Sequence, residues 1–149
     1  MKTRTKTIVL LLLAVTLHSC SKDKDDSPTP EPTVTELLTS GKWYLEAYST
    51  DEGNIPPRTD CQKHSYLQFF PNGNRMSENF HSDDEDNCVT ANIVTGTWEL
   101  IDDTQINYSQ DGVETFIEIV LITETQLILS QSMADLVYTL IFDKNPGNG

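Results

Sequence analysis

The stretch that decides the fold is VETFIEIVLIT (113–123), TQLILSQ (125–131) and LVYTLIFD (136–143). Apolar and polar side chains mostly alternate within each segment, and turn-forming residues separate one segment from the next. Alternation with a period of two is typical of a β-strand that packs one face against a core. The sequence therefore predicts three long antiparallel strands at the end of the chain.

Five shorter strands are expected upstream of these three. The turn formers Pro71-Asn72-Gly73-Asn74 and Asp102-Asp103 mark boundaries between them. No stretch of the folded part has the pattern of a long amphipathic helix, which argues against parallel β-α-β units. Eight antiparallel strands with short turns can close into an up-and-down barrel, which leaves no exposed sheet edge. The expected fold class is therefore an all-β, antiparallel eight-stranded barrel, with its shorter strands at residues 43–48, 67–69, 75–80, 97–100 and 105–108.

A short helical turn is expected just before the first strand. Thr33-Val34-Thr35-Glu36 fits a capping box, in which the threonine hydroxyl and the glutamate carboxylate satisfy free amides at a helix start. Leu37 and Leu38 follow, and Gly41 ends the segment. These residues predict a helical turn across residues 34–40.

Side-chain parity divides the expected strands into an inner and an outer face. The barrel interior can be filled by the inner side chains or can hold one small ligand, and the sequence leaves both open. If a ligand is bound, the candidate lining residues are Leu67, Phe69, Trp98, Leu100 and Ile119. The other residues on the inner parity are Trp43, Leu45, Ala47, Ile117, Leu121, Leu127, Leu129, Tyr138, Leu140 and Phe142.

The last three strands are apolar on the outer face as well. Such a surface requires a cover, either the helical turn with Leu37 and Leu38 or a protein partner, which includes a second copy of the chain. The outer apolar residues are Phe116, Val120, Ile122, Ile128, Val137 and Ile141.

The chain begins with a basic and then apolar leader that ends at Leu17-His18-Ser19-Cys20. Lys2, Arg4 and Lys6 precede an apolar run that is too short to span a bilayer. This leader resembles a bacterial lipoprotein signal peptide, and the resemblance implies lipidation of Cys20 after removal of residues 1–19. An ordinary secretory signal is the alternative.

The segment that follows Cys20 has the composition of a tether. Ser21-Lys22-Asp23-Lys24-Asp25-Asp26 resembles the export tag that carries lipoproteins of Bacteroides-type bacteria to the outer face of the outer membrane. Retention on the periplasmic side is the alternative. Alternating prolines in residues 27–33 favour an extended spacer. The sequence therefore predicts a leader at 1–19, a lipidated tether at 20–33 and one barrel domain at 34–149.

The chain is strongly acidic, with a formal net charge of −13. Removal of the three basic leader residues leaves 7 basic against 23 acidic residues, a net charge of −16. Such a surface repels phosphate backbones and anionic lipid headgroups. We therefore expect no nucleic acid partner, and membrane association only through lipidated Cys20.

Cys61 and Cys88 form an even pair once Cys20 is lipidated, and an exported protein meets an oxidising compartment. A disulfide between them is expected; free thiols are the alternative, and no Cys-x-x-Cys spacing indicates a metal site. His64 and His81 lie near these cysteines, beside the acidic run 83–86. A cation site there is conceivable, but a solvated hairpin loop is favoured, so no metal is predicted.

Motifs for catalysis are missing from the sequence. It contains no Gly-x-Ser-x-Gly elbow and no glycine-rich phosphate loop, and paired cysteines leave no free thiol nucleophile. The sequence therefore predicts neither an enzyme nor a cofactor.

The order of short motifs resembles the lipocalins. Gly41-Lys42-Trp43 opens the first strand after the helical turn, and Gly96-Thr97-Trp98 opens a later one. Together with Cys61, Leu67-Gln68-Phe69 and Cys88, this order is similar to that of lipocalin-like domains in Bacteroides-type lipoproteins, over residues 37–143. The chain lacks the Thr-Asp-Tyr motif of classical lipocalins, and Lys144 stands where an arginine would pack over Trp43.

The function expected from these observations is that of a binding or accessory domain anchored by lipid to the cell outer membrane and facing the cell exterior. A small apolar ligand in the barrel is one expectation. The alternative is a protein interaction or structural module with a filled barrel and no small-molecule ligand.

Overall fold

The computed structural model describes residues 30–54 and 59–147. The chain from Glu31 onward forms one compact unit with its own hydrophobic core, separate from residues 1–30. The predicted leader, the lipidation site Cys20 and most of the predicted tether lie outside the described residues. In the part that is described, no helix is both long and apolar enough to cross a membrane.

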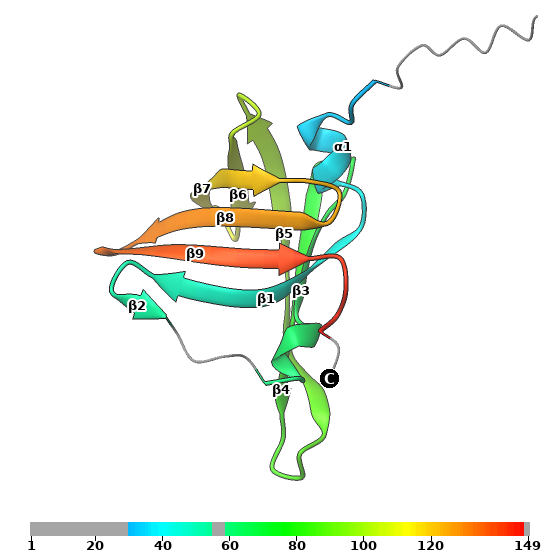
Figure 1. Cartoon of the computed structure of the whole chain (residues 1–149), viewed down its shortest axis with the longest axis vertical. Helices are drawn as coiled ribbons and strands as arrows, with labels where there is room; N and C mark the ends of the chain where they lie inside the picture. Colours follow the sequence, from blue (N-terminus) through cyan, green and yellow to red (C-terminus); the bar gives the residue numbers. More distant parts are fainter. Residues whose placement is uncertain (1–29, 55–58, 148–149) are drawn as a thin grey trace, which may run out of the picture. The chain divides into compact units, whose positions relative to one another are not determined.

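The compact unit consists almost entirely of strands (Figure 1). A single short α-helix begins its described part, and a 3₁₀ turn lies between two strands. In chain order the elements are α1 (Val34–Leu38), β1 (Lys42–Thr50), β2 (Gly53–Asn54), η1 (Gln62–His64), β3 (Tyr66–Phe69), β4 (Asn74–Ser82), β5 (Cys88–Ile101), β6 (Gln105–Gln110), β7 (Val113–Ile122), β8 (Gln126–Met133) and β9 (Leu136–Asp143).

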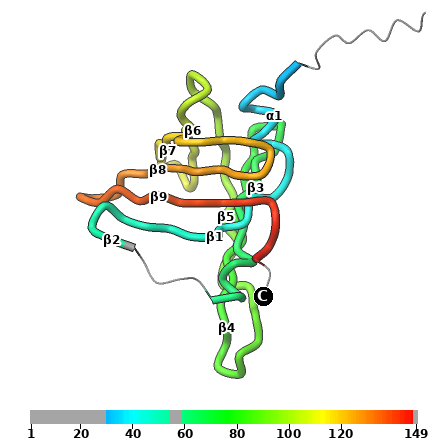
Figure 2. The backbone as a smooth tube through the Cα atoms, viewed as in Figure 1, coloured from blue at the N-terminus to red at the C-terminus, as the bar shows by residue number. Residues whose placement is uncertain are grey.

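Strands β1 and β3–β9 form a closed antiparallel up-and-down barrel in the described part of the chain. Each strand pairs with the next, and β1 pairs with β9, with Leu45 opposite Phe142 and Tyr48 opposite Leu140. Figure 2 shows this closure, since the first and last long strands lie side by side. The short β2 extends one end of β1. The predicted eight-stranded barrel is confirmed.

The helix α1 closes one end of this barrel. Thr33 and Glu36 form the predicted capping box, and each side chain accepts a hydrogen bond from the other residue's backbone N–H. Leu38 is fully buried, and its carbonyl oxygen accepts a hydrogen bond of 3.0 Å from the indole N–H of Trp43. The expectation that α1 covers the outer wall is therefore wrong, because Leu38 joins the core inside the barrel.

Two β-bulges, in β1 and β7, change which side chains face the barrel interior, so part of the predicted inner and outer assignment is wrong. One lies between Leu45 and Ala47 in β1, and the other lies between Ile119 and Leu121 in β7. A bulge adds one residue to one strand, so the side chains beyond it change face. Ala47 and Leu121 are therefore exposed instead of inward, and Ile122 packs against the core instead of the outside.

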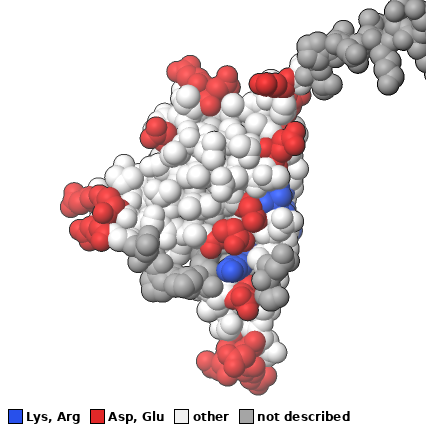
Figure 3. Space-filling view, in the orientation of Figure 1, with Lys and Arg blue, Asp and Glu red and all other residues white. Residues whose placement is uncertain are grey.

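Strand β5 begins much earlier than the predicted 97–100. Its first half pairs with β4 in a long hairpin that projects beyond the barrel (Figure 1). Val89, Ala91 and Ile93 alternate with polar residues in this half, but the side chains of both faces are exposed or only half-buried. The acidic loop 83–86 turns the hairpin, and Asp83 Oδ1 accepts hydrogen bonds from the backbone N–H groups of Glu85 and Asn87. Figure 3 shows acidic side chains at the far end of this hairpin and at other ends of the unit.

A disulfide joins Cys61 to Cys88, as the cysteine count predicts. It ties the segment that opens η1 to the first residue of β5. His64 follows on η1 and hydrogen-bonds the carbonyl oxygen of Asp60 through Nδ1, at 2.9 Å. Within the described ranges, no group of three or more His, Cys, Asp or Glu side chains is placed to hold a metal ion.

Candidate functional site

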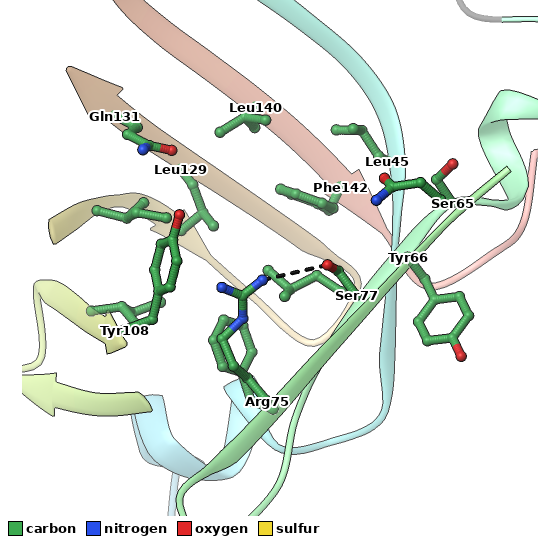
Figure 4. Close-up of a pocket in the computed structure, with 15 residues that line it drawn as sticks. Leu45, Ser65, Tyr66, Arg75, Ser77, Tyr108, Leu129, Gln131, Leu140 and Phe142 are labelled. Carbon is green, nitrogen blue, oxygen red and sulfur yellow. Dashed lines mark hydrogen bonds between the residues drawn. The ribbon is translucent and has the colours of Figure 1, made fainter. Parts of the chain in front are cut away.

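The interior of the barrel holds a cavity of about 180 Å³. It is partly open to solvent, and every barrel strand except β5 contributes to its lining (Figure 4). Most of its wall is apolar, as expected for the inner face of a barrel. The apolar lining residues are Leu45, Leu67, Phe69, Ile106, Ile117, Leu129, Leu140 and Phe142.

One side of the cavity is polar. The polar lining residues are Ser65, Tyr66, Arg75, Ser77, Asn79, Tyr108 and Gln131. Tyr66 contributes to the lining, but its ring points away from the cavity (Figure 4). The cavity therefore combines a broad apolar surface with a small polar region from β4, β6 and β8, which is the usual composition of a small-molecule site.

Arg75 dominates this polar region. It lies near the start of β4, is only 8% exposed and points into the cavity (Figure 4). Its Nη2 donates to Ser77 Oγ at 3.4 Å, and its Cζ lies 4.2 Å from the centre of the Tyr108 ring. Burial lowers the pKa of Arg75 from its usual value, and Tyr108 partly offsets that change. An arginine stays protonated in proteins, so the cavity contains a positive charge.

Gly96 marks a close approach between β5 and β6 next to Arg75. It lies opposite Arg75 in the β4–β5 pairing, and the next strand, β6, supplies Tyr108. A Cβ at residue 96 would collide with the carbonyl oxygen of Ser109. The missing side chain therefore allows β5 and β6 to approach closely beside Arg75.

The five predicted lining residues divide into two groups. Leu67 and Phe69 line the cavity. Trp98, Leu100 and Ile119 belong to the core around it and are outside the lining. Trp98 packs edge-on against Phe69, with ring centres 5.0 Å apart, and its indole N–H donates to the carbonyl oxygen of Phe70 at 3.0 Å.

The sequence reasoning missed Arg75, Ser77 and Tyr108. The hairpin turn at residues 71–74 contained the needed information, because it places Arg75 opposite Phe69 and Ser77 opposite Leu67. Residues that face each other in a strand pair share a face of the sheet. A polar residue opposite an inward apolar residue therefore indicates a polar group inside the barrel.

A second polar cluster lies on the outer side of β3. The Tyr66 hydroxyl donates to Glu78 Oε2 at 2.8 Å, Thr90 Oγ1 donates to Glu78 Oε1 at 2.9 Å, and Lys42 Nζ lies 3.7 Å from the centre of the Tyr66 ring. Burial, followed by the Glu78 carboxylate, raises the pKa of Tyr66 to about 12. The hydrogen bonds from Tyr66 and Thr90 lower the pKa of Glu78. These contacts cross-link β3, β4 and β5, and they face away from the cavity.

Comparison with known proteins gives a family and a fold. The sequence model of the lipocalin-like domain family matches residues 39–129. A lipocalin-like protein from Bacteroides uniformis superposes with a TM-score of 0.53 at 13% identity, over 74% of this chain and 99% of that chain. No functionally curated protein matches the sequence significantly.

Two further solved structures show weaker similarity. Bovine odorant-binding protein, in complex with a selenium-containing odorant, has a TM-score of 0.44 and 17% identity over 78% of this chain and 76% of its own. Japanin from Rhipicephalus appendiculatus, bound to cholesterol, has a TM-score of 0.42 and 13% identity over 76% of this chain and 79% of its own. The family match spans more than half of the chain and coincides with strands of the closed barrel, so this chain belongs to the lipocalin-like domain family.

Proposed function

We propose that this chain is a binding protein that holds a small apolar molecule inside its barrel. The observation that carries this proposal is the cavity of about 180 Å³ with its largely apolar wall. Protein interiors are close-packed, and they contain few voids larger than a water molecule. An apolar cavity of roughly 150 Å³ in another protein binds benzene. The ligand class that fits is therefore a small apolar molecule with little more than the bulk of one ring or a short alkyl chain.

Binding is favoured over catalysis by the chemistry of the lining. Two serines, Ser65 and Ser77, line the cavity. Activation of a serine requires an adjacent base, and the described lining residues include no histidine and no carboxylate. The lining is thus suited to holding a molecule rather than to reacting with it.

The proposal places the barrel at the cell surface. The leader and Cys20 resemble a lipoprotein signal, and the acidic tether resembles an export tag. A chain anchored through Cys20 to the outer face of the outer membrane would meet small molecules outside the cell. The supporting residues are all in the sequence before the barrel, so this part of the proposal is tested separately from ligand binding.

Calorimetric titration with octan-1-ol tests the ligand-binding part. Residues 21–149 contain the whole compact unit, and we expect saturable binding with one molecule per chain. Leu140→Trp would fill the cavity from its wall and should abolish binding. Val120→Trp adds the same side chain on the outer face, where Val120 is 57% exposed, and should bind like the wild type.

Two results would contradict the proposal. One is the absence of saturable binding by the wild-type chain. The other is binding that Leu140→Trp leaves unchanged while urea unfolding shows the variant to be folded. The first result would mean that the barrel does not bind the probe, and the second would place the bound probe outside the cavity.

A second candidate function is supported by the outer wall. Phe116, Val120 and Val137 are 51%, 57% and 39% exposed, so apolar side chains face solvent on β7 and β9. Exposed apolar patches often mark protein contacts. Under this alternative the chain is an interaction module, and Val120→Lys should weaken its association with a partner or a second copy, measured by sedimentation, without a change in octan-1-ol binding.

A further inference from the structure

Arg75 is a buried cation in the wall of an otherwise uncharged cavity. Its side chain lies beside Tyr108 and Ser77 and is directed into the cavity space (Figure 4). Only 8% of the residue is exposed. Among the described residues that line the cavity, Arg75 is the one that carries a charge.

The guanidinium has hydrogen-bonding capacity that the fold leaves unused. An arginine carries five N–H donors. One donor reaches Ser77 Oγ at 3.4 Å, which is long for a hydrogen bond, and Nε is buried with no hydrogen-bond partner among the described residues. Burial and Tyr108 are the causes of the change in its pKa, and no described carboxylate contributes. Among the described residues the cation therefore has no counter-ion, and its Nε donor has no partner.

Such an arrangement is unfavourable in an empty barrel. Burial of a charge is costly unless the charge is paired and hydrogen-bonded. An apolar residue of similar volume at such a position is often neutral or stabilising. Arg75 is thus poorly explained as a packing residue, whereas an anion that enters the cavity would satisfy its free donor.

We infer that the ligand of the cavity is a small amphiphile with a carboxylate, which binds to Arg75 while its apolar part packs against residues such as Leu129 and Phe142. The inference rests on the proposed function, since it names the chemical class of the ligand that the barrel holds. A planar carboxylate offers two acceptor oxygens that match the guanidinium fork. The Ser77 hydroxyl lies beside this fork and can donate to the same carboxylate, while the ring of Tyr108 lies against the guanidinium.

The positive charge of Arg75 contrasts with the acidic character of the whole chain. The sequence has 23 acidic residues against 10 basic ones, so its overall field disfavours anions. An anion that binds must therefore be recognised locally. Arg75 supplies that local positive charge inside the barrel, where low dielectric strengthens it.

Matched probes test the inference. Residues 21–149 are titrated calorimetrically with octanoate and with octan-1-ol, which share the alkyl chain and differ in the headgroup. We expect octanoate to bind at least tenfold more tightly, because charge-assisted hydrogen bonds are stronger than neutral ones. The preference should decrease as the pH is lowered far enough to protonate octanoate, whereas octan-1-ol binding should not change in the same way.

Substitutions of Arg75 test whether this residue causes the preference for octanoate over octan-1-ol. Arg75→Met keeps the length of the side chain without charge and should lower octanoate affinity to that of octan-1-ol, with octan-1-ol binding retained. Arg75→Lys keeps the charge without the fork and should retain part of the preference. Lys42→Met is the matched control, because it removes one positive charge from an exposed side chain on the outer face and should leave the preference unchanged.

The outcomes separate this inference from the proposed function. Equal binding of octanoate and octan-1-ol by the wild type would overturn the inference and leave the proposed function standing. A preference that persists in folded Arg75→Met would overturn it as well. Absence of binding by both probes would contradict the proposed function and the inference together. The wild-type comparison needs no substitution, so it decides the matter even if Arg75→Met fails to fold.

Discussion

Lys144 and Trp43 form a stacked pair at the closed end of the barrel. The Nζ atom of Lys144 lies 3.2 Å from the centre of the Trp43 ring, as the position of Lys144 after the last strand predicts. This Nζ is buried and has no hydrogen-bond partner among the described residues. The ammonium is thus held by the aromatic face alone, an attraction that competes with the cost of its burial.

The first prediction concerns the pH dependence that Lys144 imposes on stability. Burial lowers the pKa of Lys144 to about 8, whereas an unfolded lysine has a pKa of roughly 10.4. Between these values the unfolded chain binds a proton that the folded chain lacks, so this group makes the free energy of unfolding rise with pH. Between pH 7.5 and 9.5, the free energy of unfolding measured with urea should therefore rise more for the wild type than for Lys144→Met. Parallel pH profiles for the two chains would contradict the assignment.

The upper limit of that pH range follows from Tyr66. Its pKa is raised to about 12, so above the usual tyrosine value of about 10 the folded chain keeps a proton that the unfolded chain loses. Stability from Tyr66 is therefore lost as pH rises through that window. The Lys144 comparison is best made below it, where the two effects do not overlap.

The second prediction concerns Gly96. Its replacement by alanine would push a Cβ into the carbonyl oxygen of Ser109, and backbone atoms cannot move aside as a flexible side chain can. We expect Gly96→Ala to lower the free energy of unfolding by about 1–3 kcal/mol, as overpacking does in other cores. Thr95→Ala, at the exposed neighbouring position, is the control and should cost far less. Equal stability of Gly96→Ala and the wild type would show that β5 and β6 are not as close as described.

At the scale of elements, the long β4–β5 hairpin is held to η1 by the disulfide. Cys61 and Cys88 are 27 positions apart in the sequence. A cross-link that closes a loop of this length disfavours the unfolded chain by about 3.5 kcal/mol in the loop-entropy model. Beyond the disulfide, the hairpin is joined to the barrel by contacts such as the backbone N–H of Phe80, which donates to Ser65 Oγ at 3.0 Å.

The third prediction follows from this cross-link. Cys61→Ser combined with Cys88→Ser should lower the free energy of unfolding by about 3.5 kcal/mol, and dithiothreitol should have a similar effect on the wild type. The double variant should be insensitive to the reductant. Peptide mapping without reduction should find the two cysteines linked in protein from the cell envelope; two freely alkylated thiols would contradict the pairing.

The sequence predicts well the strands whose two faces lie in different environments. Residues 113–143 alternate because one side meets the core and the other meets solvent. The first half of β5 was missed because it lies in the hairpin beyond the barrel, where neither face packs against the core and a short run with small and polar residues gives only a weak pattern. The exposure of Leu121 was missed because a bulge shifts the parity without any change in composition.

The candidate site was predictable only in part for a similar reason. Leu67 and Phe69 were identified because apolar residues on the inner parity are expected in a core. Arg75 was not, because a cation is normally assigned to the surface. Its inward position depends on the register between β3 and β4, which the turn at residues 71–74 sets but does not make evident.

At the scale of the whole molecule, the fourth prediction concerns the anchor. If Cys20 is lipidated, Cys20→Ser should leave the chain unprocessed or release it from the membrane fraction, as measured by detergent partitioning of cell envelopes. A Cys20→Ser chain that is still processed and still partitions as a lipidated protein would contradict the anchor. Protease accessibility of the wild type on intact cells distinguishes display on the cell exterior from a periplasmic position.

The fifth prediction concerns the ligand that the native chain carries. A molecule that fits a cavity of about 180 Å³ and is held by apolar contacts and Arg75 should remain bound through a gentle purification. Leu140→Trp, which fills the cavity, should exclude it, whereas Val120→Trp on the outer wall should retain it. Fragmentation of the released molecule in the mass spectrometer would also show whether it contains a carboxylate.

Native mass spectrometry of residues 21–149, exported and purified without detergent from the native host, therefore tests the central claim most directly. We predict a wild-type chain with one small organic molecule bound, and the same molecule on Val120→Trp but not on Leu140→Trp. A wild-type chain that shows only its own mass, and that takes up neither octanoate nor octan-1-ol when these are added, would contradict the claim that the barrel is a binding site.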